Sequence, residues 1–242
     1  MLTTTYKAQL REKEYVADGT MAFYFEKPAG FQFRPGQYLD VTLINPPETD
    51  AEGNIRSFSI ASSPAEANLM LATRMRDTAF KRVLRALPFH AEVQVEGPMG
   101  SFTLHKNALK PAVFLAGGIG ITPFSSILRQ AASDKLAQQL YLFYSNRRPE
   151  DTAFLKILQE LEKENPNFHF IPTMTEMDKS HHPWSGETGF INKGMLTKYL
   201  PSLQGPIYYS AGPPKMVAAM QEMLKTAGVD EDDTRSEEFG GY

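Results

Sequence analysis

The stretch "FLAGGIGITPF", Phe114 to Phe124, joins an apolar run to a segment with helical spacing, and three glycines stand at the junction. Because glycine has no side chain, a phosphate can approach the backbone closely there. The N-terminus of the following helix offers unpaired N–H groups and a partial positive charge. We interpret Gly117, Gly118 and Gly120 as a pyrophosphate seat, with Thr122 as the helix cap and Pro123 at the first position of the helix. A tight turn without a ligand is the alternative.

Around this stretch, from residue 108 onward, strand patterns alternate with helical patterns. The run Ala112–Gly118 is continuously apolar, as in a strand buried on both faces of a parallel sheet. Alternation of this kind predicts βαβ crossovers and an open parallel α/β sheet. The expected strands after the first are 139–145, 168–175 and 206–212, with a last one in the tail 233–242. The expected helices are 122–133, 149–164, 192–200 and 213–228.

The part before residue 108 has a different rhythm. Strand patterns recur about every 10–15 residues, which is typical of a small antiparallel β-barrel or sandwich. They cover 6–17, 20–28, 33–44, 55–64, 68–75 and 91–98, and a helical pattern covers 78–87. We therefore expect two domains, an N-terminal antiparallel β-barrel over 1–107 and an α/β open parallel sheet over 108–242.

Composition excludes several classes of function. The net charge of −3 argues against a nucleic-acid partner, and no apolar run is long enough for a membrane span. The chain has no cysteine, which excludes disulfides, a thiolate nucleophile and an iron–sulfur cluster on this chain. His181 and His182 stand in a polar loop, and we interpret them as solvated, so no metal site is predicted. The N-terminus lacks the pattern of a signal peptide, and we expect a cytoplasmic protein.

Two further strand ends carry residues suited to a dinucleotide. Gly212 and Pro213 follow the strand 206–212, and Ser145 and Arg147 end the strand 139–145. Parallel strands expose their carboxyl ends at one edge, where open α/β sheets bind ligands. These residues and the glycine turn are therefore predicted to meet at one edge. The alternative for Arg147 is a solvated loop charge.

The barrel contributes a second candidate site. In "RSFS", Arg56 to Ser59, an arginine suited to a phosphate alternates with Phe58, and Ser57 and Ser59 are small polar neighbours. Thr78 and Ala79 begin the helical pattern and offer a second place for an anion. For Arg56 to Ser59, the alternative is an ordinary strand whose side chains alternate between the core and solvent without binding a ligand.

Six motifs now stand in order along the chain: "RSFS", "GPMGSF", "GGIGITP", "YSNRRPEDTAF", "AGPPKMV" and the terminal "EEFGGY". Together they resemble the ferredoxin–NADP(H) reductase superfamily of flavoproteins. The resemblance implies a flavin on the barrel and a nicotinamide dinucleotide on the α/β domain. FAD is favoured over FMN as the bound flavin because it is the usual flavin of the family. NADPH is slightly favoured over NADH as the coenzyme because Ser145 and Arg147 are candidates for binding a 2′-phosphate.

The resemblance also implies roles for single residues. Arg56 would bind the flavin phosphate, Phe58 would stack on the flavin ring where Tyr is usual, and Ser59 would hydrogen-bond flavin N5. Other residues would hold the cofactors. Ser57 would also bind the cofactor. The residues for the flavin tail are Thr73, Met75, Thr78 and Ala79, and those for the dinucleotide are Gly117, Gly118, Gly120, Thr122, Pro123, Ser145, Arg147, Gly212 and Pro213.

Three residues concern the reacting rings. Phe239 or Tyr242 would cover the outer face of the flavin. Ala211 stands where the family commonly has Cys, which puts the geometry and rate of hydride transfer in doubt.

The implied activity is hydride transfer from NAD(P)H to FAD, followed by electron transfer to a separate redox protein such as ferredoxin, flavodoxin or an oxygenase component. The alternative is a flavin-binding electron-transfer or regulatory subunit that works only within a larger complex. The sequence does not set the oligomeric state, and a monomer is the default expectation.

Overall fold

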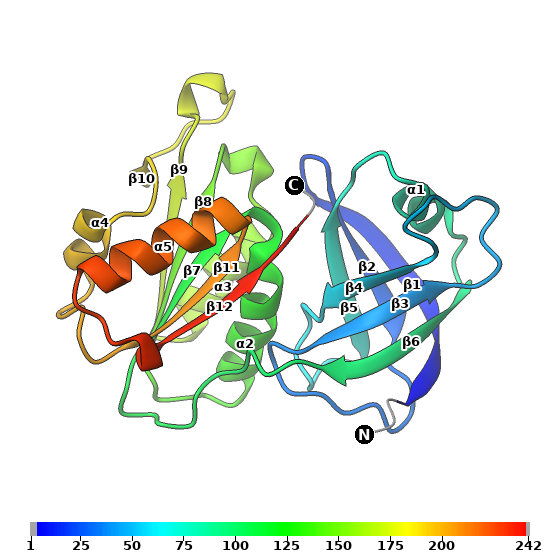
Figure 1. Ribbon diagram of the computed structural model, residues 1–242, viewed down its shortest axis with the longest axis horizontal. Helices are drawn as coiled ribbons and strands as arrows, with labels where there is room; N and C mark the ends of the chain where they lie inside the picture. The colour runs from blue at the N-terminus through cyan, green and yellow to red at the C-terminus, as the bar shows by residue number, and fades with distance from the viewer. Residues whose placement is uncertain (1–3, 241–242) are drawn as a thin grey trace.

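Two halves of different architecture make up the protein, in a computed structural model that describes residues 4–240 (Figure 1). The first half is built of strands and carries one α-helix, α1 (Ala79–Ala86). Its strands are β1 (Thr5–Ala17), β2 (Thr20–Glu26), β3 (Tyr38–Leu43), β4 (Ile55–Ser59), β5 (Asn68–Arg74) and β6 (Glu92–Met99).

The six strands of the first half form one antiparallel sheet with the order β4-β3-β6-β1-β2-β5. A bridge between Ile60 and Leu71 joins the two edges, so the sheet closes into a barrel. Strand β6 shows the period of two expected for such a wall, because Val93 and Val95 are fully buried and their neighbours face solvent. Helix α1 places Phe80 in the barrel core.

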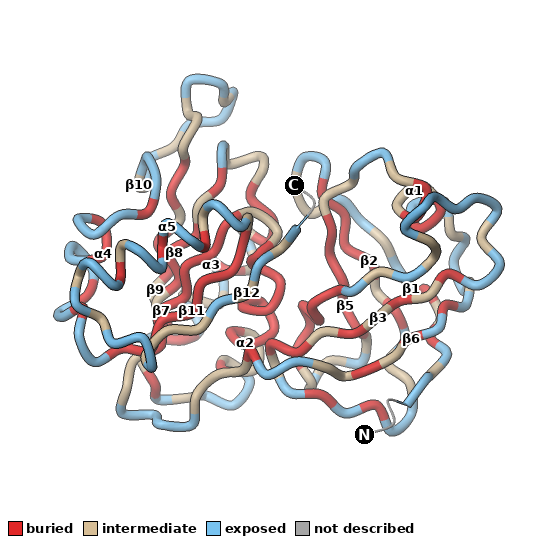
Figure 2. Tube along the Cα trace, viewed as in Figure 1, coloured by how far each residue is buried: buried red, intermediate tan, exposed pale blue. Residues whose placement is uncertain are grey.

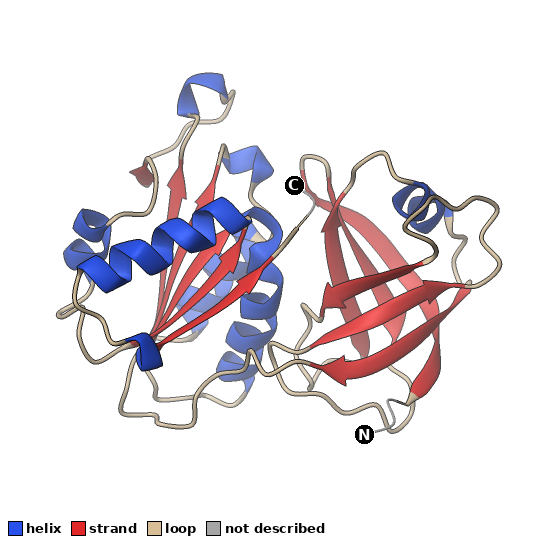
Figure 3. Ribbon diagram, in the orientation of Figure 1, coloured by secondary structure: helices blue, strands red, loops and turns tan. Residues whose placement is uncertain are grey.

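The second half is a parallel sheet with helices on both faces (Figure 3). Its strand order is β10-β9-β8-β7-β11-β12. The strands are β7 (Ala112–Gly117), β8 (Leu140–Asn146), β9 (Phe168–Met174), β10 (Glu187–Thr188), β11 (Ile207–Gly212) and β12 (Thr234–Glu238). The helices are α2 (Ile121–Ser133), α3 (Leu155–Glu164), α4 (Lys193–Tyr199) and α5 (Pro214–Thr226). Both predicted architectures, barrel and parallel α/β sheet, are confirmed.

Strand β7 lies in the middle of this second sheet and is buried along its whole length. Its side chains alternate between two apolar layers. Phe114 packs with Phe124 of α2 on one face, and Leu115 packs with Leu224 of α5 on the other. A strand covered on both faces needs apolar residues at every position, which explains the continuous apolar run in the sequence.

The two halves share one apolar core where they meet (Figure 2). Met70 of the barrel belongs to the same buried cluster as Phe124 of α2. Phe102, in the segment between β6 and β7, lies 5.7 Å from Phe124 and 5.7 Å from Tyr209 between ring centroids. Helix α2 also bonds the barrel directly, since Ser125 Oγ donates to the carbonyl of Ala61 at 2.9 Å. The halves are therefore joined by a shared buried cluster and by a direct hydrogen bond.

A few predicted elements differ from the observed ones. Helix α3 begins at Leu155 instead of residue 149, because Phe154 has a positive φ of 63° that no continuous α-helix adopts. The segment Pro149–Asp151 forms a separate 3₁₀ turn. The tail does supply a strand, β12, and the two-residue strand β10 was not predicted. Over residues 4–240, no helix has the length and apolar character needed to cross a bilayer.

Gly120, in the turn after β7, packs directly against the end of β11. A Cβ atom on Gly120 would lie 2.3 Å from the carbonyl oxygen of Ala211, a backbone atom that cannot rotate away. Overpacking of this kind typically costs about 1–3 kcal/mol. We expect Gly120→Ala to lower the Tm of the flavin-free protein by about 4 °C or more, measured by thermal unfolding.

The matched control is Gly240→Ala, because an added Cβ there meets no atom within 4 Å. Its Tm should stay within about 1 °C of the original protein. Equal Tm values for both variants would contradict the close approach of Gly120 to the end of β11.

Candidate active site

A cleft of about 460 Å³ opens where the barrel faces the glycine turn of the second half. Its barrel wall contains six of the residues predicted to bind the flavin: Arg56, Ser57, Phe58, Ser59, Thr73 and Thr78. Ile119 and Thr122 line it from the second half, and Phe239 lines it from the C-terminal segment. One cleft thus brings together residues that lie far apart in the sequence.

Arg56 lies in the middle of this wall on strand β4. Its guanidinium carbon lies 5.1 Å from the centre of the Phe80 ring, a cation–π contact that fixes the side chain. Phe58 is buried, and its ring lies 6.0 Å from Phe80 with a tilt of 34° between the planes. An aromatic core residue of the barrel therefore supports both the predicted phosphate ligand and the predicted stacking ring.

The two serines of this strand have different surroundings. Ser57 donates its hydroxyl to Asp40 on β3, which keeps it at the exposed side of the strand. Ser59 is buried and still lines the cleft. Ser59 is therefore the residue of the pair that can offer a hydroxyl to a ligand in a dry environment.

The residues predicted for the flavin tail are only partly brought together. Thr73 and Thr78 line the cleft, and Thr78 Oγ1 caps helix α1 by accepting from Lys81 N at 3.4 Å. Met75 packs against the barrel core instead of lining the cleft. Ala79 is buried, and its N–H donates to Asp50 Oδ2 at 3.1 Å. The structure thus leaves Met75 and Ala79 off the wall of the cleft.

Three basic residues of the cleft were not predicted: Arg74, Arg76 and Lys81. Lys81 Nζ donates to the carbonyl of Arg74 at 2.7 Å, which holds the ammonium near the cleft. Burial first, and then the charges of Arg76 and Arg56, lower the pKa of Lys81. Positive charges this close together repel one another, and a bound anion such as a pyrophosphate would offset that repulsion. The residues present therefore fit a phosphorylated ligand.

These three residues left a signal in the sequence. Arg74, Arg76 and Lys81 lie just before and just after the predicted helix start at Thr78. Positive charges close to a helix N-terminus oppose the helix dipole and are unfavourable without an anion. The position of these three positive charges in the sequence therefore indicates an anionic ligand.

The ends of three neighbouring strands form the predicted dinucleotide side. Ser145 on β8 pairs in register with Gly117 on β7. A Cβ on Gly212, at the end of β11, would lie 3.1 Å from the backbone nitrogen of Gly117. Pro213 lies against Gly117 as well, because a Cβ there would be 3.2 Å from Pro213 Cδ. These predicted residues do meet at one edge of the sheet.

The helix after the glycine turn begins earlier than predicted. Residues Gly118–Gly120 already form a 3₁₀ turn that runs into α2 at Ile121. Thr122 therefore lies inside the first turn and not at the cap, and its hydroxyl donates to the carbonyl of Ile119 at 3.0 Å. Pro123 is the third residue of α2 and not the first. The predicted cap at Thr122 and the predicted first position of Pro123 were wrong, because the turn Gly118–Gly120 runs directly into α2 and Gly120 is the cap.

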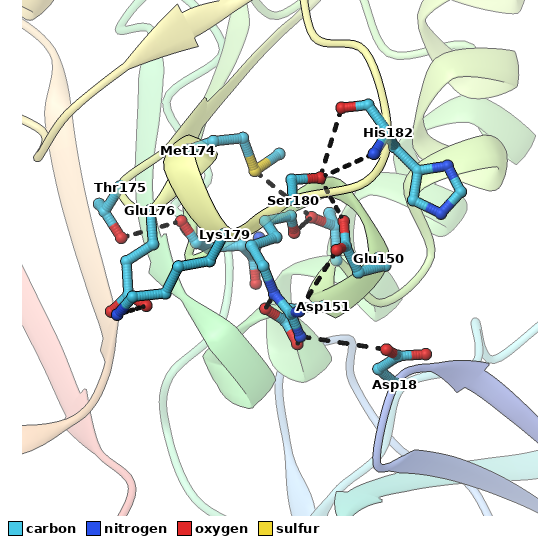
Figure 4. A network of polar contacts seen from close by, with 12 residues as sticks. Asp18, Glu150, Asp151, Met174, Thr175, Glu176, Lys179, Ser180 and His182 are labelled. Atoms are coloured by element: carbon cyan, nitrogen blue, oxygen red, sulfur yellow. Dashed lines mark hydrogen bonds and ion pairs between the residues drawn. The ribbon is translucent and has the colours of Figure 1, made fainter.

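Arg147 and its neighbour Arg148 have different surroundings at the end of β8. Arg147 is exposed, and its backbone carbonyl accepts from Glu176 N at 2.8 Å. Arg148 Nε donates to Asp151 at 2.8 Å, and Arg148 Nη2 lies 4.0 Å from Asp18 of the barrel. Figure 4 shows Asp151 and Asp18 in this polar network. Arg148 is thus committed to protein carboxylates, whereas Arg147 faces solvent.

Three predicted residues remain: Ala211, Phe239 and Tyr242. Ala211 is fully buried at the end of β11 and contributes a methyl group but no ionisable atom. The backbone N–H of Phe239 donates to the carbonyl of Gly212 at 3.0 Å, which holds the ring of Phe239 at the cleft. Tyr242 lies outside the described residues. Among the described residues, Phe239 is therefore the C-terminal aromatic that meets the cleft.

Family models match both halves of the chain. The oxidoreductase FAD-binding domain matches residues 7–104, and the oxidoreductase NAD-binding domain matches residues 114–222. The predicted cofactors, FAD and a nicotinamide dinucleotide, are thereby confirmed.

Two whole proteins that resemble this chain are reductase components, in agreement with the family models. The glycine betaine monooxygenase reductase subunit of Chromohalobacter salexigens is 29% identical, with 91% of this chain and 60% of the relative covered. The reductase component of propane 2-monooxygenase from Rhodococcus jostii is 29% identical, with 88% and 57% covered. The chain thus spans less than two thirds of the length of these two relatives.

A solved structure shares the fold across both halves. A ferredoxin NADP⁺ reductase of Neisseria gonorrhoeae, with bound FAD and NADP, superimposes with a TM-score of 0.79 at 19% identity, covering 97% of this chain and 98% of that chain. With an FAD-binding barrel, an NAD-binding α/β sheet and a cleft that joins them, this chain belongs to the ferredoxin–NADP(H) reductase superfamily.

Proposed function

We propose that the chain is an NAD(P)H-dependent flavoprotein reductase that passes electrons through FAD to a separate redox protein. The observation that carries the proposal is the cleft walled by both domains, with the Arg56–Ser59 strand on one side and Ile119 and Thr122 of the glycine turn on the other. A cleft of this kind can align two cofactors for direct transfer without a side-chain nucleophile.

Bound FAD would supply the redox chemistry, accepting two electrons with a proton and releasing electrons one at a time. The protein residues would bind and orient. Arg56 and Lys81 would attract the phosphates, the buried Phe58 would support the ring, and the buried Ser59 would offer a hydroxyl to it. Phe239 at the mouth of the cleft would keep water from the reacting face.

The dinucleotide would bind along the strand ends that carry Ser145, Gly117 and Gly212. The lack of a side chain at Gly117 and Gly212 lets the strand ends and Pro213 pack closely, and the N-terminal end of the 3₁₀ turn and α2 adds a partial positive charge that would attract a pyrophosphate. Ala211 has no side-chain atom that can transfer a proton, so we assign it a role in shape alone.

The electron acceptor belongs to the proposal as well. The two relatives are a reductase subunit and a reductase component of monooxygenase systems, which supports an oxygenase component, a ferredoxin or a flavodoxin as the partner. We also propose a cytoplasmic location, and a domain division at 1–107 and 108–242. The end of β6 at Met99 and the start of β7 at Ala112 support this division.

The activity is tested by adding NADH or NADPH to the FAD-loaded protein without oxygen. We expect at least one of them to bleach the flavin absorbance within the mixing time or seconds after it, because the two proposed binding sites meet at one cleft. If neither coenzyme bleaches the flavin, the proposed activity is wrong. Steady-state turnover with an artificial acceptor separates a free-standing reductase from a subunit that works only in a complex, since the latter would be slow alone.

Coenzyme preference is tested at Arg147. We expect Arg147→Ala to raise the Kd of NADPH about tenfold and to change that of NADH less than about twofold, because a guanidinium pairs with a 2′-phosphate and NADH has none. The matched control is Arg148→Ala. Its side chain is bound to Asp151 and lies near Asp18, so it should lower stability without changing the ratio of the two Kd values. An equal effect of Arg147→Ala on both coenzymes would remove this assignment.

The role of Lys81 is tested by pH. A protonated lysine attracts a pyrophosphate, and the pKa of Lys81 is lowered, so its proton is lost at a lower pH than from a free lysine. FAD affinity should therefore fall as pH rises toward this lowered pKa. In Lys81→Met the affinity should be about tenfold weaker near neutral pH, and this decline should be absent. Lys163→Met, on α3, is the control and should retain the original profile; identical profiles for all three proteins would contradict the role.

A further inference from the structure

The loop between β3 and β4, residues 44–54, contacts Arg56, the residue proposed to bind the flavin phosphate. We name it the acidic strap, after its three carboxylates Glu48, Asp50 and Glu52. Its base is closed by a hydrogen bond from Leu43 N to the carbonyl of Asn54 at 3.0 Å. Between these ends the strap is largely exposed, and its carboxylates contact cationic or N–H groups of the barrel.

The cationic end of Arg56 is already paired with the strap. Nη2 lies 2.7 Å from Glu52 Oε2 and 3.4 Å from Asp50 Oδ1. Nη1 donates to three backbone carbonyls of the same region, that of Ile55 at 2.7 Å among them. A phosphate needs the outer N–H groups of the guanidinium fork for a bidentate contact. It therefore competes with the strap carboxylates for Nη2.

Asp50 also covers the N-terminus of helix α1. Its Oδ2 accepts from Ala79 N at 3.1 Å, while its Oδ1 is the atom near Arg56. Although burial alone would raise the pKa of Asp50, hydrogen bonds from the N–H groups of Glu52 and Ala79 and the charge of Arg56 lower it overall. Asp50 thus stays ionised near neutral pH and bridges the two groups that an anion would use.

Glu48 anchors the strap further along the same helix. Its two oxygens accept from Arg82 Nε at 3.0 Å and from Arg82 Nη2 at 2.6 Å. Arg82 is also paired with Asp77, which lies outside the strap. These are exposed ion pairs, each of which contributes little to stability. The strap can therefore lift from α1 at low cost while its base stays closed.

We propose that the acidic strap occupies the flavin phosphate position in the flavin-free protein and must lift before FAD binds. The inference rests on the proposed use of this cleft for FAD. A strap that is closed most of the time lowers the apparent affinity by the fraction of molecules in which it is open. The strap also disfavours anions that bind weakly. A ligand must replace the contacts of Asp50 with Arg56 and with Ala79 N before it can bind.

The test compares Asp50→Asn with Asp77→Asn by FAD titration of the flavin-free proteins, using quenching of flavin fluorescence. Both variants remove one carboxylate near α1, but only Asp50 contacts Arg56 and Ala79. We expect Asp50→Asn to bind FAD about tenfold more tightly and to take it up faster, and Asp77→Asn to stay within about twofold of the original protein. Equal affinities for the two variants would overturn the strap.

A second variant and a second measurement guard against a folding defect. Glu52→Gln changes an exposed side chain, 72% accessible, that contacts Arg56, and we expect about threefold tighter FAD binding. Hydrogen exchange of residues 44–54 should rise when FAD is added to the original protein. Unchanged or slower exchange on FAD addition would also overturn the strap.

The outcomes for the strap and for the proposed function are distinct. If the original protein and all variants fail to bind FAD, the proposed function fails and the strap fails with it. If FAD binds but the variants at Asp50 and Asp77 match, the strap alone is refuted.

Discussion

The hydrogen bonds from helix α2 to the barrel hold the two halves of the active site in place. Ser125 and Ser126 are buried, and their hydroxyls donate to the carbonyls of Ala61 at 2.9 Å and Ser62 at 2.6 Å. Ala61 and Ser62 follow almost directly after the Arg56–Ser59 strand, and α2 follows directly after the glycine turn. One helix therefore fixes the flavin side and the dinucleotide side against each other. Buried hydrogen bonds of this kind are costly to break because each broken partner stays dry.

Much of this arrangement follows from local sequence. The change from a period of two to alternating strands and helices near residue 108 predicts both architectures, because each pattern matches one way of burying apolar surface. Ser145, Gly117 and Gly212 were predicted to converge because parallel strands end at a common edge, and they do. Six motifs in order supplied the family.

Other features could not be derived from the sequence. The start of α2 depends on the conformation of three glycines, and glycine permits both a loop and a helical turn. The break at Phe154 is a positive φ at an aromatic residue, which tertiary packing imposes against local preference. The position of Asp50 against Arg56 and Ala79 arises from the path of a long loop, and loop paths leave no periodic pattern.

The shared apolar cluster of the two halves has a consequence for how the chain can be divided. Met70 and Ala72 of the barrel and Phe124 of α2 bury their side chains against one another across the boundary between the domains. A polypeptide that ended between β6 and β7 would present this surface to water. The carbonyls of Ala61 and Ser62 would also lose their hydrogen bonds from Ser125 and Ser126. Exposed patches of that kind promote self-association. Separately synthesised halves would therefore have to find each other to cover this surface, and the segment between β6 and β7 supplies Phe102 to the same cluster.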